Sequence, residues 1–394
     1  MGVEHSAVGG EILKAAREAA GISLTTMAAR VHFSVGQLSN VEAGRRVATP
    51  ELVAAYEREI GEPVNRRAFL ALPAIPPSAL SRMASDAERV FSTTESAASR
   101  AERVTDQVEQ RGRECVVRPS TEMLRQLLTD FDGLRLLIDR TRTPKLQTQL
   151  YRSAALTAAL TADALMVLGD RDNAQAWHGV ASVAARESGD RGAAATVAGL
   201  GSLISLYYGD LSETISRTRT CTRLTGGRTE SAGVMAQTVQ ALALARIGDH
   251  TAAREALSRA EAGLTVLGGS GNSVFEFAER RFLFYASRTL LHLGDLRAAA
   301  DAQDAALALY PSTSVGDPTL IRLDRAAVQA RAGDVDGAIG HAVQVLNGVP
   351  VERRARIYLD HAASLIDALP IEQRTRPSVR DYTDTLDTMK RTIG

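Results

Sequence analysis

The side chains best suited to chemistry near the N-terminus are two amides, Gln37 and Asn40, three residues apart. A Gln or Asn amide donates and accepts at the same time, so it can pair with both hydrogen-bonding atoms that adenine presents in the major groove. Val35 precedes them and could contact the methyl group of thymine. Arg45 and Arg46 follow, and guanidinium groups bind phosphate. This order of residue types indicates contact with double-stranded DNA, although the two arginines could also be solvated loop charges.

Gln37 could instead have a structural role at the start of its helix. Ser34 and Gln37 form the Ser-x-x-Gln pattern of a capping box, in which the glutamine side chain folds back onto the start of its own helix. A side chain held there cannot pair with a base, so both interpretations stay open for Gln37. Asn40 has no such conflict, because Leu38 and Val41 mark the buried side of the helix and Asn40 points away from them.

Two short helices joined by a tight turn must position these side chains within residues 23–46. Ser23 is expected to cap the first helix, and Gly44 to end the second in a left-handed conformation. The first helix carries apolar residues at helical spacing, namely Leu24, Met27, Ala28 and Val31. Amphipathic helices are predicted on both sides, the earlier one with Ile12, Leu13, Ala16 and Ala20, and the later one with Thr49, Pro50, Leu52, Tyr56 and Ile60.

Over residues 10–62, the order and lengths of these helices resemble the λ-repressor-like helix-turn-helix domain of the XRE family. The resemblance implies that the N-terminal half of the second helix faces base edges, while its flanks face phosphate. The residues assigned to DNA contact are therefore Ser34, Val35, Gly36, Gln37, Ser39, Asn40, Arg45 and Arg46. Many relatives carry Gln at the first position of the preceding helix. Leu24 stands there in this sequence and weakens the expected clamp on the DNA backbone.

The balance of charge limits how tightly this unit can bind DNA. The whole chain has 46 basic and 46 acidic residues, and residues 1–67 contain eight of each. A neutral unit displaces few counterions from DNA, so its nonspecific affinity should be low. Two linked half-site contacts are then needed, and we expect a homodimer.

Several other classes of function find no support in the sequence. Cys115 and Cys221 form no Cys-x-x-Cys motif and no two histidines are four residues apart, so no metal, cofactor or disulfide is predicted. No catalytic triad or paired-carboxylate pattern can be singled out, so we do not expect an enzyme. No run of about eighteen apolar residues could cross a membrane, and the unpaired cysteines fit a reducing, cytoplasmic location.

A repeat runs through the second half of the chain. Gly-Asp pairs begin at Gly169, Gly209, Gly248, Gly294 and Gly333, with spacings of 40, 39, 46 and 39 residues. Small residues recur seven before, five after and twelve after each Gly, as in Ala241, Ala253 and Ala260. Small side chains let antiparallel helices approach closely, and Gly-Asp forms the turn between them. The pattern resembles the tetratricopeptide repeat and predicts an all-α fold with a C-terminal α-solenoid.

The predicted organisation has three parts. Residues 1–65 form the helix-turn-helix domain, and residues 66–85, with Pro73, Pro76 and Pro77, form a linker. Residues 86–394 form the helical repeat domain, which is expected to sense a ligand and to dimerise. Within it, the glycine-rich residues 268–272 account for the longer spacing of 46 and are expected to be a flexible insertion.

The resemblance to tetratricopeptide modules implies that the first helix of each pair lines an inner groove. Carried over by position, the groove residues are Tyr207, Thr238, Arg246, Arg281, Phe284, Arg288, His292 and Arg331. Such a cationic, partly apolar groove would suit a peptide or small-molecule effector that carries an anionic group. Nearby, Phe275 and Phe282 are expected on one helical face and Phe277 and Phe284 on another, each packed against an adjacent helix or left for a ligand to cover.

The joined architecture resembles XRE-type regulators with C-terminal tetratricopeptide-like repeats, which are common in actinobacteria. It also resembles, more distantly, the peptide-sensing quorum regulators of Gram-positive bacteria. The resemblance implies a dimeric, sequence-specific DNA-binding transcriptional regulator whose repeat domain binds an effector that alters DNA binding. The alternative is a protein-interaction scaffold that recruits a partner through its repeats, with little control of DNA binding by a ligand.

Overall fold

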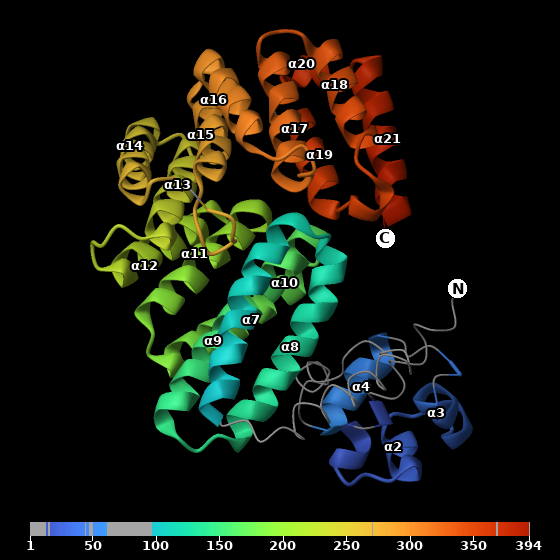
Figure 1. Ribbon diagram of the computed structural model, residues 1–394. Helices are drawn as coiled ribbons and strands as arrows, with labels where there is room; N and C mark the ends of the chain where they lie inside the picture. The colour runs from blue at the N-terminus through green and yellow to red at the C-terminus, as the bar shows by residue number, and fades with distance from the viewer. Residues whose placement is uncertain are drawn as a thin grey trace. The chain divides into compact units, whose positions relative to one another are not determined.

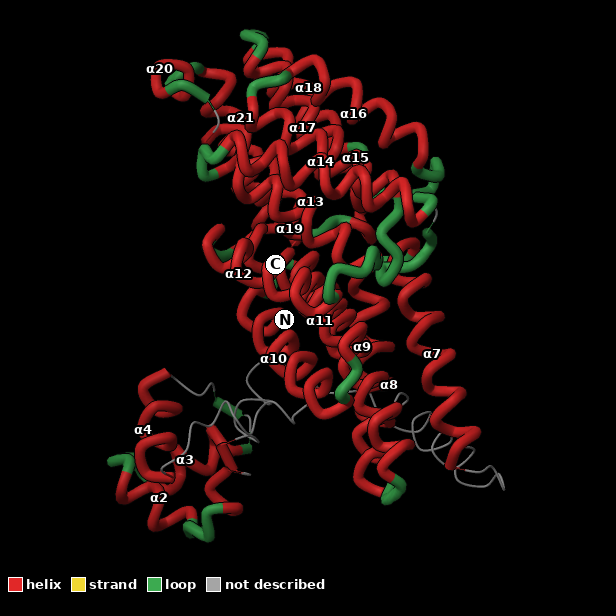
Figure 2. The backbone as a smooth tube through the Cα atoms, turned by 90° about the vertical axis from the view of Figure 1, so that its left-hand side faces the viewer, coloured by secondary structure: helices red, strands yellow, loops and turns green. Residues whose placement is uncertain are grey.

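The computed structural model describes residues 13–14, 16–43, 45–46, 50–60, 97–269, 271–367 and 369–393. All regular structure in these ranges is helical, which confirms the predicted all-α class (Figures 1 and 2). The chain divides into two compact units, Met1–Thr94 and Glu95–Gly394. The predicted linker lies outside the described residues, so the domain boundaries stay a prediction. No described helix has the length and apolar character needed to span a membrane.

The N-terminal unit contains α2 (Leu24–Arg30), α3 (Val35–Glu42) and α4 (Pro50–Ile60), preceded by helical residues 13–14 and 16–19. Ser23 accepts a hydrogen bond from the amide of Thr26 and caps α2 as predicted. The four helical segments share one apolar core, built from Leu13, Met27, Ala28, Val31, Leu38, Val41, Leu52 and Tyr56. The expected left-handed Gly44 lies outside the described residues, and α3 ends at Glu42 with Ala43 as its C-cap.

The C-terminal unit begins with α7 (Ala97–Val117) and α8 (Ser120–Arg140). Five helix pairs follow: α9 (Pro144–Leu168) with α10 (Arg171–Ser188), α11 (Arg191–Tyr208) with α12 (Leu211–Thr225), α13 (Ser231–Arg246) with α14 (His250–Leu267), α15 (Glu279–Leu293) with α16 (Leu296–Leu309), and α17 (Gly316–Arg331) with α18 (Val335–Asn347). The short 3-10 helix η1 (Val351–Arg353) leads to α19 (Arg356–Asp367), α20 (Ile371–Arg374) and α21 (Pro377–Ile393). Each pair is centred on one of the five predicted Gly-Asp turns.

Both residues of each Gly-Asp pair stabilise the turn between two helices. At four of the five predicted turns the Gly has a positive φ, for example 85° at Gly169 and 102° at Gly333, where a Cβ would cause strain. The Asp then accepts a hydrogen bond from an amide of the next helix and caps its N-terminus. Gly209 is the exception, with φ −121°. The capping aspartates are Asp170, Asp210, Asp249, Asp295 and Asp334, with Asp190 doing the same between α10 and α11.

The small residues at the repeat offsets lie between closely packed helices. Ala241, Ala253 and Ala260 all have no exposed side-chain surface, and the same holds for Ala299, Ala306 and Ala338 in later pairs. Cys221 occupies one of these positions, and its Sγ lies 3.2 Å from the carbonyl oxygen of Ala195. Cys221 therefore packs as one of the small buried residues, and burial raises the pKa of its thiol to about 12.

Residues 273–278, which join the glycine-rich residues 268–272 to α15, pack against α7, and the flexibility expected of residues 268–272 stays a prediction. The amide of Val274 donates to the carbonyl of Gly112 on α7 at 2.9 Å, and Phe277 is buried. A side chain at Gly112 would come within 2.8 Å of the Phe275 ring, so this approach needs glycine. Because α15 begins at Glu279, Phe275 and Phe277 lie in the segment before this helix rather than on the helical faces predicted for them.

Candidate DNA interface and ligand cavity

The start of α3 is fixed by a complete capping box. The amide of Gln37 donates to Ser34 Oγ at 3.2 Å, while the Ser34 amide and hydroxyl both donate to Gln37 Oε1, at 3.2 and 3.0 Å. The structure therefore shows the capping role of Gln37. Contact between Gln37 and a base stays a prediction, and it would require the side chain to leave the cap.

The remaining predicted DNA contacts surround α3. Val35 is 42% exposed although it is apolar, and nothing lies within 4 Å of the space that a side chain at Gly36 would fill. Past the helix, the amides of Arg45 and Arg46 both donate to the carbonyl of Asn40, at 2.8 and 3.0 Å. These backbone bonds hold the two exposed arginines beside the end of α3. Ser39 and Asn40 are half-buried.

A buried ionic group anchors the other end of α3. Glu42 is 4% exposed and accepts two hydrogen bonds from Arg17, at Nε and Nη2, both of 2.7 Å. The hydroxyl of Tyr56 on α4 donates to the same carboxylate at 2.7 Å. The hydrogen bond to Glu42 raises the pKa of Arg17, and burial with the adjacent carboxylate raises the pKa of Tyr56. One carboxylate thus joins α3 to two other helical segments.

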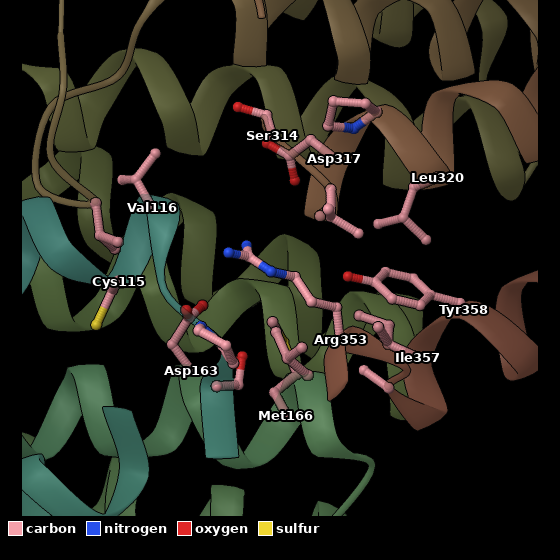
Figure 3. A pocket seen from close by; sticks show the side chains of 18 of the residues that line it. Cys115, Val116, Asp163, Met166, Ser314, Asp317, Leu320, Arg353, Ile357 and Tyr358 are labelled. Atoms are coloured by element: carbon pink, nitrogen blue, oxygen red, sulfur yellow. The ribbon is translucent and has the colours of Figure 1, made fainter. Parts of the chain in front are cut away.

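The C-terminal unit contains a partly open cavity of about 160 Å³ (Figure 3). Its walls include the first helices of four pairs, through Asp163 on α9, Tyr207 on α11, Arg281 on α15 and Asp317 on α17. The end of α7 and residues 353–358 complete it. Helices from the two ends of the repeat array therefore meet around one space.

The cavity wall holds several charged and phenolic groups. Arg281 lies 3.8 Å from the carboxylate of Asp317, which also accepts a hydrogen bond of 2.7 Å from the Tyr310 hydroxyl. Among the described residues, the carboxylate of Asp163 has no hydrogen bond and no ion pair within 4.0 Å. Burial raises the pKa of Asp163 to about 6, against the opposing effect of the Arg281 charge.

Residues 10–69 match the family described as helix-turn-helix domain. The N-terminal unit is a helix-turn-helix domain. The match confirms the expected resemblance of the N-terminal residues to a helix-turn-helix domain. A DNA-binding domain of this kind is typical of transcription regulators. In the helix-turn-helix domain, α3 takes the place of the DNA-reading helix.

Two solved structures are similar to this chain at low sequence identity. One is PlcR of Bacillus thuringiensis in complex with the peptide PapR7 and DNA, with 12% identity, a TM-score of 0.36, and coverage of 77% of this chain and 93% of PlcR. The other is the apo form of the competence regulator ComR of Streptococcus vestibularis, with 13% identity, a TM-score of 0.32, and coverage of 82% and 98%. A comparison with curated proteins gives no match.

Leu24, the departure from the usual glutamine of helix-turn-helix domains, is explained by packing. It is the first residue of α2, half-buried, and lies against the apolar core of the domain. A leucine there contributes apolar contact, at the expense of the hydrogen bond that a glutamine could give.

Most of the eight predicted groove residues lie near one another, but two of them line the cavity. Tyr207 and Arg281 line the cavity, whereas the lining does not include the other six. Arg246 and Arg331, at equivalent repeat positions, donate to the carbonyls of Leu206 and Leu291 at 2.9 and 2.8 Å. They therefore bind C-terminal carbonyls of the preceding first helix, as cations often do. Thr238 and Phe284 are buried among the helices, and His292 is half-buried.

Arg288 belongs to a buried network instead. Its guanidinium donates to the hydroxyl of Tyr207 at 3.1 Å and lies 3.6 Å from the carboxylate of Asp324. His361 on α19 lies 2.8 Å from the other oxygen of Asp324. The charges of His361 and Arg288 lower the pKa of Asp324 against the effect of burial. Ligand contact by the eight groove residues stays a prediction, and the cavity supports it for Tyr207 and Arg281.

Proposed function

We propose that the chain is a transcription regulator that binds a specific DNA site through α3 and responds to an effector bound in the helical body. The observation that carries the DNA part is the exposed start of α3, held in place by the capping box and by the buried carboxylate of Glu42. Val35, Gly36 and Asn40 are then available for base edges, and Arg45 and Arg46 for phosphate.

Dimerisation follows from the charge balance. Residues 1–67 have equal numbers of basic and acidic residues and gain little from counterion release, so one copy would bind DNA weakly. Two linked copies add their contacts at two half-sites one helical turn apart. We therefore propose a homodimer bound to an inverted repeat.

The cavity supports the effector part of the proposal. Its walls come from helices at both ends of the repeat array, so a molecule bound there would contact segments more than 200 residues apart in the chain. An effector changes DNA binding only through unequal affinity for the two arrangements of the body. A cavity formed between several helices allows such a difference, because small changes of helix packing alter its lining.

The test is the capture of genomic DNA fragments by the purified full chain, with and without metabolite extract. The proposal predicts a small set of fragments bound above nonspecific background, and a loss of these fragments with the variant Asn40→Ala, Arg45→Gln. Fragment-independent binding under both conditions, or equal capture by that variant, would contradict it.

An interaction scaffold is the second candidate, and an open surface groove favours it. Residues of α12, α13 and α14 line this groove, with polar side chains that include Arg219, Arg223, Gln237 and Gln240. Recovery of one stoichiometric protein partner, together with DNA occupancy that no small molecule changes, would support the scaffold.

A further inference from the structure

The volume of the cavity limits the size of the effector that it can hold. A cavity of about 160 Å³ is close in volume to engineered cavities of about 150 Å³ that bind benzene. It therefore has room for one ring or for an aliphatic chain of similar volume. A peptide of several residues would leave most of its atoms outside.

The charges of the lining select for an anion. Arg280, Arg353 and Arg354 form no ion pair with any carboxylate of the described residues. Arg353 instead donates to the carbonyl of Val117 at 2.9 Å, and Arg280 lies over the ring of Tyr310. A guanidinium that binds only neutral groups gains when a carboxylate arrives, because charge-assisted hydrogen bonds are about twice as strong as neutral ones.

The two acidic residues of the lining do not cancel this preference. The carboxylate of Asp317 is already engaged by the Tyr310 hydroxyl and Arg281. Asp163 has a pKa of about 6, so it is mostly ionised at pH 7, but a bound anion beside it favours its protonated form. A protonated carboxyl donates a hydrogen bond, so Asp163 can serve an anionic ligand as a donor.

Apolar side chains complete the site. Val116, Leu320 and Ile357 line the cavity, and Figure 3 shows Arg353 extending into the space between the elements that carry Asp163 and Asp317. An amphiphilic ligand could therefore place its charged end at the guanidinium and its body against the apolar wall.

We propose that this cavity binds a small organic carboxylate of about one ring in size, with its carboxylate on the guanidinium of Arg353. The inference rests on the proposed function and names the effector class. Arg353 also joins the end of the repeat array to α7, through its bond to Val117 across 236 residues of sequence. A carboxylate that draws Arg353 to itself would change this contact at α7, the first helix of the body.

Binding to the purified full chain tests the inference without DNA. The probes are benzoate, cyclohexanecarboxylate, hexanoate and 4-hydroxybenzoate, each beside its neutral amide, measured by calorimetry and thermal shift. We expect at least one carboxylate to bind and to raise the unfolding temperature, and its amide to bind at least about tenfold more weakly. Arg353→Gln should weaken carboxylate binding about tenfold or more, and Arg353→Lys less, because the lysine keeps the charge.

Arg228→Gln is the matched control, because Arg228 is an exposed arginine of the same unit that pairs with Glu230 away from the cavity. It should leave binding unchanged. Equal binding of acids and amides, unchanged binding in Arg353→Gln with a native circular dichroism spectrum, or no binding by any carboxylate would overturn the inference. If the chain captures specific DNA fragments but binds none of these probes, the proposed function stands and the carboxylate inference is wrong.

Discussion

At the scale of single residues, Asn40 and Arg45 should differ in what they give to DNA binding. Replacing Asn40 by Ala removes a side chain assigned to a base, so affinity for the preferred site should fall by about 1–3 kcal/mol and specificity should relax. Arg45→Gln should weaken all sequences alike and reduce the salt slope by about one. Fluorescence anisotropy at several salt concentrations measures both effects. Equal losses on preferred and scrambled DNA for Asn40→Ala would show that it reads no base.

Glu42 is expected to contribute more to stability than any exposed acid of the DNA-binding domain. Glu42→Gln leaves the buried guanidinium of Arg17 with the exposed Glu18, at 3.5 Å, as its remaining charged partner, which should cost about 3–5 kcal/mol. Glu59→Gln is the control, because Glu59 is more exposed and its pairing distance to Arg30 is 3.9 Å. That change should cost at most about 1 kcal/mol. Hydrogen exchange of the α2 and α3 amides measures both. Similar protection in the two variants would contradict the anchoring role.

His178 should make the helical body sensitive to acid. Burial and the charge of Arg217 lower the pKa of His178 to about 4, while Glu213 acts in the opposite sense. The folded state then binds fewer protons than the unfolded state, whose histidine titrates near 6.5, so stability falls as the pH drops from about 6.5 to 4. The loss should be at most about 3 kcal/mol. Thermal unfolding at pH 4.5 and 7 should show a smaller difference for His178→Gln than for the native chain. An identical difference would exclude His178 as the cause.

The buried ionic group at the end of α3 could not be predicted from the sequence, for one physical reason. Arg17, Glu42 and Tyr56 are separated by 25 and 14 residues, and no local pattern tells which charged side chains become buried together. The capping role of Gln37, by contrast, could be predicted from Ser34 three residues earlier, because a capping box depends on local sequence alone.

At the scale of elements, the repeat offsets specify close helix contacts. Ala260 on α14 has no exposed surface, so Ala260→Leu should overpack the interface and cost about 1–3 kcal/mol. Ala262→Leu on the exposed side of the same helix is the control and should change stability by less than about 0.5 kcal/mol. Urea denaturation monitored by circular dichroism measures both. Equal costs would mean that the small-residue offsets do not set the packing.

The helix pairs could be predicted because each turn carries its own signal. A Gly in the left-handed conformation and an Asp that caps the next helix are local requirements, and they recur at Gly169, Gly248, Gly294 and Gly333. The packing of residues 273–278 could not be predicted in this way, because the contact of Val274 with Gly112 joins segments about 160 residues apart.

At the scale of the whole molecule, the cavity shows where sequence reasoning stops. The repeat offsets placed Tyr207 and Arg281 at a common surface, and both line the cavity. Arg353 and Tyr358 lie after the last repeat pair, so no offset applies to them. They reach the cavity because the segment after the last repeat pair lies against α7, where Arg353 contacts Val117, and lines the same cavity as α9.

Selection from a random duplex pool tests most directly whether a pair of α3 helices reads a specific DNA site. The purified full chain should enrich two half-sites in inverted repeat, with centres about 10–10.5 base pairs apart or a multiple of that spacing. The same selection with Asn40→Ala should lose preference at one position of each half-site. A pool that stays random after repeated rounds, under conditions in which the protein is folded, would contradict the account.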